Sequence, residues 1–176
     1  RVQATYELPE KFILFVGTLE PRKNLSRLIQ AVSSMRDAPP LLIAGMEGWG
    51  EEAPVLNHDV RFLGFVPAHN LPAIYEACTV FAFPSIFEGY GLPVIEAMAH
   101  GAPVVTSRGI STEEVAGGAA VLVDPLNVDS IVDGIRKAMS SADELRARGL
   151  ERARDASWAT TAELTVAAYR DTLERA

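Results

Sequence analysis

Six short apolar runs of strand length alternate with helical patterns along most of the chain. Each run is nearly continuous in apolar residues, which is typical of strands buried on both faces of a parallel sheet. The repeated order of strand, helix and strand predicts an α/β fold with a doubly wound, parallel, six-stranded, Rossmann-like sheet. The expected strands span residues 11–17, 40–45, 60–66, 80–85, 103–107 and 119–124.

The helical patterns fall between these runs and after Asp124. Asn24 is expected to be the N-cap of a helix with an apolar stripe, residues 69–78 and 92–101 predict shorter helices, and residues 45–59 predict mostly loop. The last helix, from Ser157, is expected to lie against a neighbour, because its apolar residues also form a stripe. That stripe consists of Trp158, Ala162, Val166, Tyr169 and Leu173. No linker divides the chain, so residues 1–176 are expected to form one domain.

Composition and charge limit the partners of this chain. Its 176 residues are 48% apolar and 22% charged, which suits one globular domain with one hydrophobic core. No run approaches the roughly 18 apolar residues of a membrane span. The net charge of −7, without a basic cluster, argues against nucleic acid and favours small partners. Cys78 is expected to be a buried spectator, and a thiol-poor chain fits the cytoplasm.

Two unusual loops are predicted to converge on one place. In an open parallel sheet, ligands bind beyond the carboxyl ends of the strands, where the strand order reverses. With the common order 3-2-1-4-5-6, that crevice lies between the first and fourth strands. The loops concerned are 17–24, with the sequence GTLEPRKN, and 84–92, with the sequence PSIFEGYGL. We therefore expect the functional site at this crevice.

The first loop carries two adjacent cations before a helix. Arg22 and Lys23 are slightly unfavourable there, because a helix N-terminus attracts anions. A bound anion such as a phosphate would resolve the conflict, and a solvated surface pair is the alternative.

The second loop has the form of a phosphate cradle. Its two glycines would let the backbone turn tightly between strand and helix, and Pro93 suits the first helical turn. Such a turn would present four backbone amides to an anion. The four amides belong to Gly89, Tyr90, Gly91 and Leu92.

A carboxylate follows this cradle in an otherwise apolar helix. Glu96 is expected in the first turn, where the helix dipole is worth roughly 0.3–1 kcal/mol, too little to explain a buried carboxylate. Vicinal hydroxyls donating to Glu96 would explain it, as on the ribose of dinucleotide folds. Pairing with His100, four residues later, is the alternative.

Several other chemistries lack their motifs in this sequence. No G-x-G-x-x-G follows the first strand and no G-x-x-x-x-G-K-[ST] occurs, so NAD and P-loop chemistry are not expected. The three histidines are scattered and no Cys/His cluster is present, so no metal site is expected.

The segments FVGTLEPRKNLSRLIQA and PSIFEGYGLPVIEAMAHGAPVVTSRGISTEEVAGGAAVLVDP resemble the carboxyl-terminal, donor-binding domain of retaining GT-B glycosyltransferases of family four, also called group one. The resemblance covers nearly the whole chain, and two glutamates separated by seven residues are its signature. It implies that Arg22 and Lys23 bind the donor diphosphate and stabilise the leaving group. It also implies that Glu88 contacts the transferred sugar and that Glu96 holds the ribose hydroxyls. Glu88 and Lys23 are then the catalytic residues.

The same resemblance suggests where the rest of the donor binds and how it reacts. The amides of residues 89–92 match those that face the sugar and phosphates, and the backbone around Phe65 and Val66 matches the nucleobase site. The reaction would retain the anomeric configuration, by front-face attack through an oxocarbenium-like transition state, without metal or other cofactor. The donor is expected to carry a hexose, mannose-like by preference, with GDP ahead of UDP.

Departures from the family pattern also generate expectations. Many relatives carry an arginine and a glycine where this chain has Thr18 and Asn24, so Arg22 is inferred to be the second cation. The chain opens with Arg1, and the amino-terminal acceptor domain of a GT-B enzyme is absent from it. We therefore expect the chain to bind donor without transferring sugar. The resemblance implies a cytoplasmic protein, which the absent domain could bring to the inner membrane face, and a last helix that crosses toward that domain.

Two other functions remain open at this point. A nucleotide-sugar epimerase or phosphorylase on a similar fold is disfavoured by the glutamate pair and by the EPRKN segment. A non-catalytic nucleotide-sugar-binding module would keep Glu96 and the cradle, so the sequence separates it poorly from a transferase.

Overall fold

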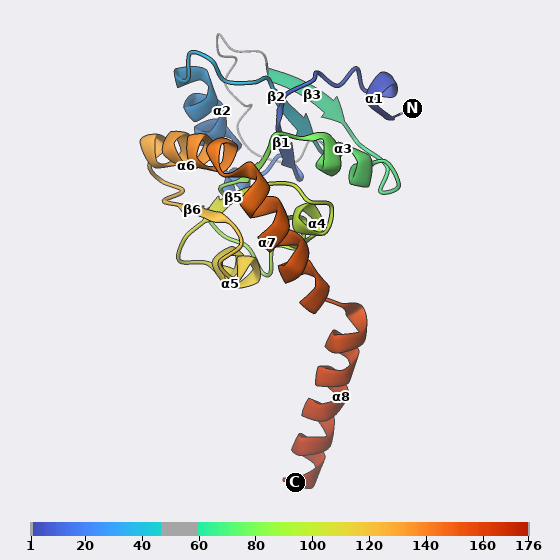
Figure 1. Cartoon of the computed structure of the whole chain (residues 1–176). Coiled ribbons are helices and arrows are strands. Elements are labelled where there is room, and N and C mark those ends of the chain that lie inside the picture. Colours follow the sequence, from blue (N-terminus) through green and yellow to red (C-terminus); the bar gives the residue numbers. More distant parts are fainter. Residues whose placement is uncertain (1, 47–59, 176) are drawn as a thin grey trace.

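A computed structural model of the chain describes residues 2–46 and 60–175, and it confirms all six expected strands. Neighbouring strands pair in parallel in the order β3-β2-β1-β4-β5-β6, which is the expected doubly wound arrangement (Figure 1). Most of the segment predicted as loop, 45–59, lies outside the described residues. The strands are β1 (Ile13–Val16), β2 (Leu41–Ala44), β3 (Val60–Gly64), β4 (Val80–Phe83), β5 (Val104–Ser107) and β6 (Val121–Val123).

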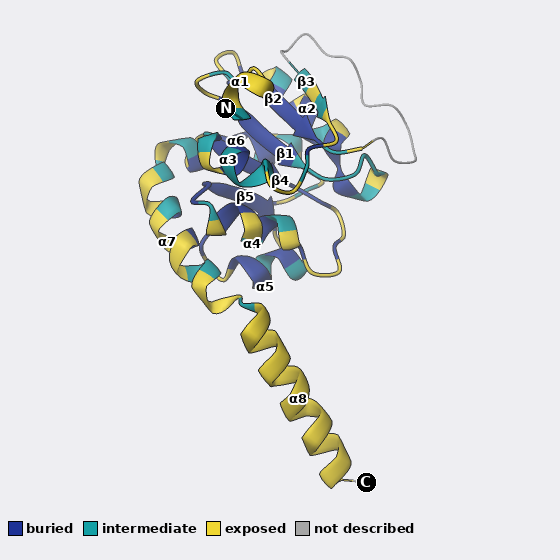
Figure 2. Ribbon diagram, turned by 90° about the vertical axis from the view of Figure 1, so that its right-hand side faces the viewer, coloured by how far each residue is buried: buried dark blue, intermediate teal, exposed yellow. Residues whose placement is uncertain are grey.

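The centre of the sheet is the core of the domain. Nearly all side chains of β1, β2, β4 and β5 are buried, as the continuous apolar runs predict (Figure 2). Phe83 stacks on Phe15 with ring centroids 6.0 Å apart and on Phe81 at 5.8 Å. Full burial of one such side chain is worth roughly 1.5–3 kcal/mol. These strands therefore form a firm base for the loops at their carboxyl ends.

The prediction that every strand is buried on both faces is wrong for the edge strand β3. Phe62 is 55% exposed, and the other side chains of β3 are half-buried or exposed. β3 pairs with β2 at one end of the sheet, so among the described strands it has a neighbour on one side alone. An apolar run therefore does not reveal whether its strand is central or at an edge.

Two layers of helices cover the sheet. α2 and α6 pack against each other, while α4 contacts α3, α5 and α7. Right-handed crossovers place the helices that follow β1 and those that follow β4 and β5 on opposite faces. The helices are α1 (Val2–Thr5), the short 3₁₀ helix η1 (Pro21–Lys23), α2 (Leu25–Ser34), α3 (Leu71–Ala77), α4 (Leu92–Ala99), α5 (Ser111–Ala116), α6 (Val128–Ser140), α7 (Ala142–Asp155) and α8 (Trp158–Glu174).

Arginine side chains of α7 tie three helices together at their carboxyl ends. Arg146 donates hydrogen bonds to the carbonyl oxygens of Gly101 and Cys78, just beyond the ends of α4 and α3. Arg152 donates to the carbonyl oxygen of Val115, near the end of α5. Carbonyl groups in the last turn of a helix lack helical partners and attract cations. α7 therefore satisfies three helix ends at once.

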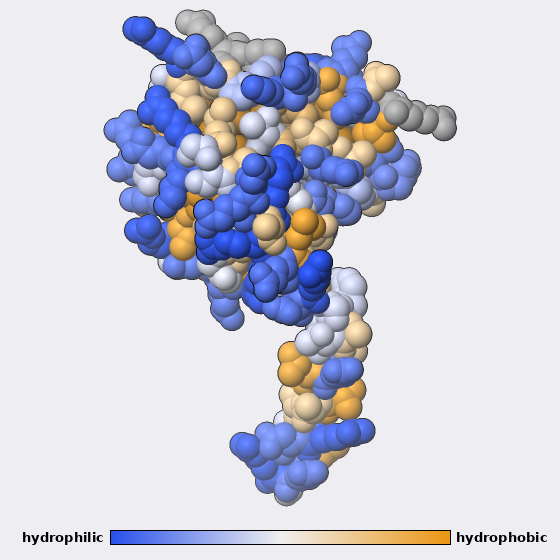
Figure 3. All heavy atoms as spheres, viewed as in Figure 1, coloured by the Kyte–Doolittle hydropathy of each residue, from blue (hydrophilic) through white to orange (hydrophobic). Residues whose placement is uncertain are grey.

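No neighbour within the described part of the chain covers the apolar stripe of the last helix, and its expected crossing toward an amino-terminal domain stays a prediction. α8 extends away from the body of the domain, and none of its residues is buried (Figure 1). Trp158 is 80% exposed and Tyr169 is 68% exposed. Apolar side chains lie among polar ones along α8 in Figure 3. An apolar stripe indicates that one face of a helix can be buried. Burial of that face also requires a second surface that packs against it.

No helix within residues 2–46 and 60–175 is both long enough and apolar enough to cross a membrane.

Removal of α8 should leave the stability of the domain almost unchanged, because α8 buries no side chain. A chain ending at Ala156 should unfold within about 2–4 °C of the full chain, which is the shift that about 1 kcal/mol would cause. Thermal unfolding followed by circular dichroism measures this. A chain ending at Ser141 is the control, since it also loses the helix-end contacts of α7, and its unfolding temperature should fall much further. A large loss from the first deletion would contradict the exposed position of α8.

Candidate donor-binding site

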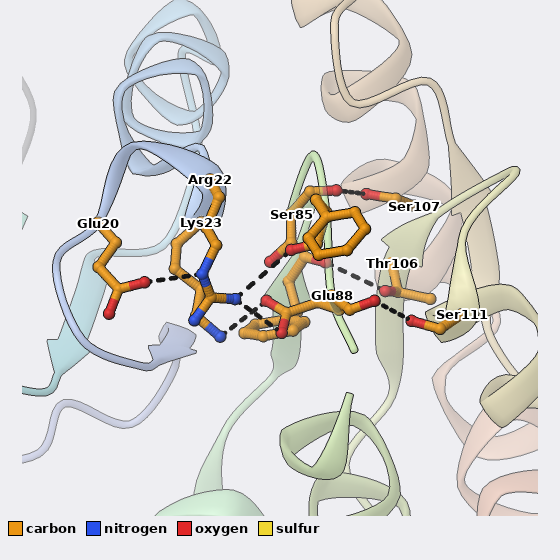
Figure 4. Close-up of polar contacts among 10 residues, drawn as sticks. Glu20, Arg22, Lys23, Ser85, Glu88, Thr106, Ser107 and Ser111 are labelled. Atoms are coloured by element: carbon orange, nitrogen blue, oxygen red, sulfur yellow. Dashed lines mark hydrogen bonds and ion pairs between the residues drawn. The ribbon is translucent and has the colours of Figure 1, made fainter. Parts of the chain in front are cut away.

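The loops after β1 and β4 meet at the crevice that the strand order predicts (Figure 4). The backbone N–H of Ile86 donates to the carbonyl oxygen of Arg22 at 2.8 Å. The side-chain amide of Asn24 donates to the carbonyl oxygen of Pro84 at 2.9 Å. Because these bonds join the two loops directly, the residues of both loops share one site.

A buried carboxylate lies between the two cations of this site. Glu88 Oε1 lies 2.7 Å from Lys23 Nζ, and Glu88 Oε2 lies 3.0 Å from Arg22 Nη1. Lys23 is 7% exposed and Glu88 is 9% exposed, so the alternative of a solvated surface pair is wrong for Lys23. Lys23 Nζ also lies 4.7 Å from the centroid of the Phe83 ring, a cation–π contact.

Arg22 has a second carboxylate partner, which sequence reasoning missed. Its Nε lies 2.7 Å from Oε2 of Glu20, two residues earlier in the same loop. Two cations thus face two carboxylates, and the cluster carries no excess positive charge. The chain thus supplies two anions of its own to Arg22 and Lys23, while the binding of a phosphate at this pair stays a prediction. The carboxylate beside PRK in the sequence was the signal that could have revealed this.

Asn24 begins α2, as expected, but it does not cap the helix with its side chain. Its φ of 60° is left-handed, a conformation that asparagine tolerates better than most residues. Its side-chain amide instead bonds the carbonyl oxygens of Pro84 and Pro125, and its oxygen accepts from Arg27. Asn24 therefore joins three segments of the chain.

The glycine-rich turn before α4 depends on one of its two glycines. Gly91 has a φ of 106°, and a Cβ there would lie 2.7 Å from the Thr112 side chain. Gly89 has no positive φ and open space around it, so its lack of a side chain is not needed for the turn. Pro93 lies in the first turn of α4, as expected. Within the described part of the chain, no hydrogen bond uses the N–H groups of residues 89–92.

A serine of α5 orients the same turn, and sequence reasoning missed it as well. The Ser111 hydroxyl donates to the backbone carbonyl oxygen of Glu88 at 2.8 Å (Figure 4). Ser111 comes 23 residues after Glu88 in the sequence, so the fold brings the two together.

The expectation of a buried Glu96 in the first turn of α4 is wrong. Glu96 is exposed and lies beyond the first turn. Its Oε2 accepts a hydrogen bond of 3.3 Å from the hydroxyl of Tyr75 on α3. No ion pair joins Glu96 to His100 among the described side chains, and the His100 ring instead stacks on Tyr75. Desolvation by burial, followed by the charge of Glu96, raises the pKa of the Tyr75 hydroxyl, so this hydroxyl remains a neutral donor.

A cavity of about 200 Å³ opens at the carboxyl ends of β1, β2 and β3. Val66 is buried in its wall, whereas Phe65 is 67% exposed at its rim. Gly45 lets the chain after β2 approach the chain after β1, since a Cβ on Gly45 would lie 1.9 Å from the carbonyl oxygen of Gly17. Its largely apolar wall could accept a flat ring. The lining residues are Val16, Gly17, Thr18, Ala44, Gly45, Met46, Phe65, Val66 and Leu71.

Cys78 is the buried spectator that the sequence predicts. Its side chain is fully buried and donates to the carbonyl oxygen of Tyr75. Burial raises the pKa of its thiol to about 12, so Cys78 is not a reactive thiolate at neutral pH.

Two solved structures match this arrangement over about half of their own chains. Sucrose-phosphate synthase from Thermosynechococcus elongatus matches 99% of this chain with a TM-score of 0.81 and 25% identity, over 49% of its own chain. A protein from Anabaena, solved in complex with UDP and glucose, matches 97% of this chain with a TM-score of 0.81 and 21% identity, over 51% of its own chain. The fold is thus a Rossmann-like half of a GT-B glycosyltransferase.

The family follows from the sequence comparison. The model of glycosyl transferases group 1 matches residues 2–156, which is most of the chain. The chain therefore belongs to the glycosyl transferases group 1 family, as the resemblance of its motifs implied. The matched residues end where α7 ends, so α8 lies outside them.

Two curated relatives are named as mannosyltransferases. The O-antigen chain mannosyltransferase B of Escherichia coli is 38% identical over 173 residues, covering 90% of this chain and 45% of the relative. The serotype-specific mannosyltransferase WbdA of Escherichia coli is 32% identical over 185 residues, covering 96% of this chain and 23% of the relative. The chain thus spans less than half the length of these two relatives.

Loss of the Glu88 carboxylate should destabilise the fold, because Lys23 would stay buried without an anion. Glu88→Ala should lower the free energy of unfolding by roughly 3 kcal/mol or more. Urea unfolding measures this loss. Glu20→Ala is the matched control, since the side chain of its partner Arg22 is 41% exposed and can be hydrated, so its cost should stay below about 1 kcal/mol. Equal losses from the two variants would contradict the unequal roles of these carboxylates.

Proposed function

We propose that this chain is the donor-binding half of a retaining glycosyltransferase, which moves a mannose-like hexose from a nucleotide diphosphate sugar to an acceptor. The observation that carries the proposal is the buried Lys23–Glu88 pair at the sheet's switch point, beside a glycine turn with free amides. Membership of the group 1 family and two relatives named as mannosyltransferases support it. The acceptor is left open.

Both cations retain donors for a diphosphate, although each is already paired. An ammonium group carries three N–H donors, and Glu88 accepts one from Lys23. The described contacts of Arg22 use its Nε and Nη1, which leaves Nη2. Phosphate oxygens can thus bind without first displacing Glu88. The amides of residues 89–92 would supply the remaining donors.

The proposed chemistry places Glu88 and Lys23 against the reacting atoms. As the bond between the anomeric carbon and the diphosphate oxygen breaks, negative charge grows on the diphosphate, and Lys23 and Arg22 stabilise it. Glu88 contacts the transferred sugar while its bond to Lys23 holds its carboxylate in place. An acceptor hydroxyl attacks the same face of the sugar and passes its proton to the departing diphosphate oxygen, so the new bond replaces the broken one with the configuration retained. Glu20 and Glu88 balance the two cations, so the diphosphate would be held by the N–H groups that Arg22 and Lys23 retain and by the amides of residues 89–92. We propose that these donors suffice without a metal.

The nucleoside would occupy the adjoining surface. We propose that the cavity beside Phe65 and Val66 takes the nucleobase and that Glu96 holds the ribose hydroxyls. The GTLEPRKN segment favours a mannose-like donor with GDP slightly ahead of UDP, whereas one solved structural relative holds UDP. The cavity does not by itself discriminate between them, because its walls are mainly apolar.

The domain assignment is part of the same proposal. Residues 1–176 form the donor half, with the helix 157–175 as its outer element, and an amino-terminal half would bind the acceptor. We place the protein in the cytoplasm, and any contact with the inner membrane face would belong to the other half. The chain alone should therefore bind donor without turnover, and release of nucleoside diphosphate on addition of acceptor would contradict this.

A non-catalytic binding module is the second candidate. The observation in its favour is that Glu88 is already engaged by two cations, as expected of a structural residue. A catalytic role of Glu88 requires its negative charge for turnover, whereas in a binding module that charge would serve only to pair the two cations.

Calorimetric titration of this chain with GDP, UDP, ADP and CDP should identify the nucleotide. Lys23→Ala should weaken the preferred nucleotide by roughly tenfold or more, through loss of a charge-assisted phosphate contact. Glu96→Ala should weaken it by roughly three- to tenfold, through loss of the ribose contact. Glu163→Ala on α8 is the control and should bind like the parent chain. If neither Lys23→Ala nor Glu96→Ala weakens any nucleotide, the assigned site is wrong.

Glu88→Gln separates a transferase from a binding module in a protein that also contains the acceptor half. Turnover should fall by roughly a hundredfold or more while nucleotide affinity changes little, if Glu88 acts mainly in the transition state. Initial-rate kinetics and calorimetry on the same variant measure the two effects. Unchanged turnover would rule out the catalytic role of Glu88.

A further inference from the structure

A tyrosine hydroxyl anchors the exposed carboxylate proposed to hold the ribose. Tyr75 is 1% exposed, and its hydroxyl donates to Oε2 of the exposed Glu96 at 3.3 Å. An exposed glutamate side chain ordinarily samples several rotamers, and ordering it costs conformational entropy. The bond from Tyr75 favours one of these positions and leaves Oε1 of Glu96 for other donors.

The Tyr75 ring is itself held on two sides. It meets the Phe81 ring of β4 edge-on, with centroids 5.3 Å apart, and it stacks on the His100 ring at 6.2 Å with an interplanar angle of 4°. A tyrosine packed in this way has little freedom to move its hydroxyl. The position of the Glu96 carboxylate is therefore fixed relative to the sheet, because Tyr75 contacts both β4 and Glu96.

α3 connects this tyrosine to the apolar cavity. Leu71, at the start of α3, lines the cavity, and Tyr75 follows four residues later on the same face of the helix. The helix that forms part of the cavity wall thus also sets the position of Glu96. A nucleoside with its base in the cavity would meet a carboxylate whose location is tied to that wall.

We propose that Tyr75 is a positioning residue for nucleoside recognition, which holds the Glu96 carboxylate ready for the vicinal hydroxyls of a ribose. This inference rests on the proposed function, and it adds a residue and a selectivity to it. Oε2 accepts from Tyr75 and from one ribose hydroxyl, and Oε1 accepts from the other. The site should therefore prefer ribonucleotides to 2′-deoxyribonucleotides, and part of that preference should depend on a hydroxyl that does not touch the ligand.

The alternative is that Tyr75 is a core aromatic whose hydroxyl simply finds a partner at the surface. Buried tyrosine hydroxyls usually do find one. In that case, loss of the hydroxyl would alter stability while the selectivity for ribose stayed the same. Selectivity is thus the measurement that separates the two readings.

Tyr75→Phe is the decisive variant, because it keeps the ring packing and removes only the hydroxyl. The variant would be titrated calorimetrically with GDP, 2′-deoxy-GDP, UDP and 2′-deoxy-UDP. We expect affinity for the preferred ribonucleotide to fall roughly three- to tenfold, and affinity for its deoxy form to change less than about twofold. In a Glu96→Ala background, Tyr75→Phe should have no further effect.

Tyr6→Phe is the matched control. The Tyr6 hydroxyl accepts a bond from Asn70, the residue before α3, so this variant loosens the start of α3 without touching Glu96. It should leave the ribose preference unchanged. A similar loss in Tyr6→Phe would overturn the proposal, because loosening α3 would then suffice.

The remaining outcomes separate this inference from the proposed function. If Glu96→Ala weakens the ribonucleotide and Tyr75→Phe does not, Tyr75 has no positioning role while the site assignment stands. If Glu96→Ala itself has no effect on any of the four nucleotides, the ribose assignment fails and the role of Tyr75 fails with it.

Discussion

The buried ion pair between Lys23 and Glu88 is the contact around which the site is arranged. It joins loops that are 65 residues apart in sequence and lie at the carboxyl ends of neighbouring strands. Burying two charges costs much of what their attraction gains, so such a pair adds little net stability. The pair instead fixes the position of the two loops, because a shift of either loop would leave a buried charge without its partner. The bonds from Ile86 to Arg22 and from Ser111 to the Glu88 carbonyl keep the loops where this pair is satisfied.

The helices around the sheet hold the other residues of the site in place. The turn before α4 can close only because Gly91 lies against Thr112 at the start of α5, so α4 and α5 place the glycine turn together. Beneath them, α7 satisfies the carboxyl ends of α3, α4 and α5 with arginine side chains. The α3–α4 contact then brings Tyr75 to Glu96. Precise sites need such support, because a side chain is only as well placed as the element that carries it.

Much of this fold could be predicted from sequence, and the failures share one cause. The strands were predictable because continuous apolar runs indicate buried parallel strands, and the convergence of residues 17–24 and 84–92 followed from the strand order. The burial of Glu96 was predicted wrongly, because apolar neighbours in a helix do not say which face meets the core. The surface that covers the α8 stripe was not predictable either, because no described part of the chain buries that stripe. Each failure concerns contact between segments rather than the character of a segment.

The sequence by itself determined the parallel α/β architecture, the switch-point loops and the family, since strand and helix periods and contiguous motifs are local properties. Only the tertiary structure decided which charges are neutralised: Lys23 by Glu88, and Arg22 by Glu20 and Glu88. It also decided that Tyr75 rather than His100 is the partner of Glu96. The physical reason is that hydrogen bonds and ion pairs act over a few ångströms. Their partners are therefore chosen by folding, which brings together side chains that the sequence keeps far apart.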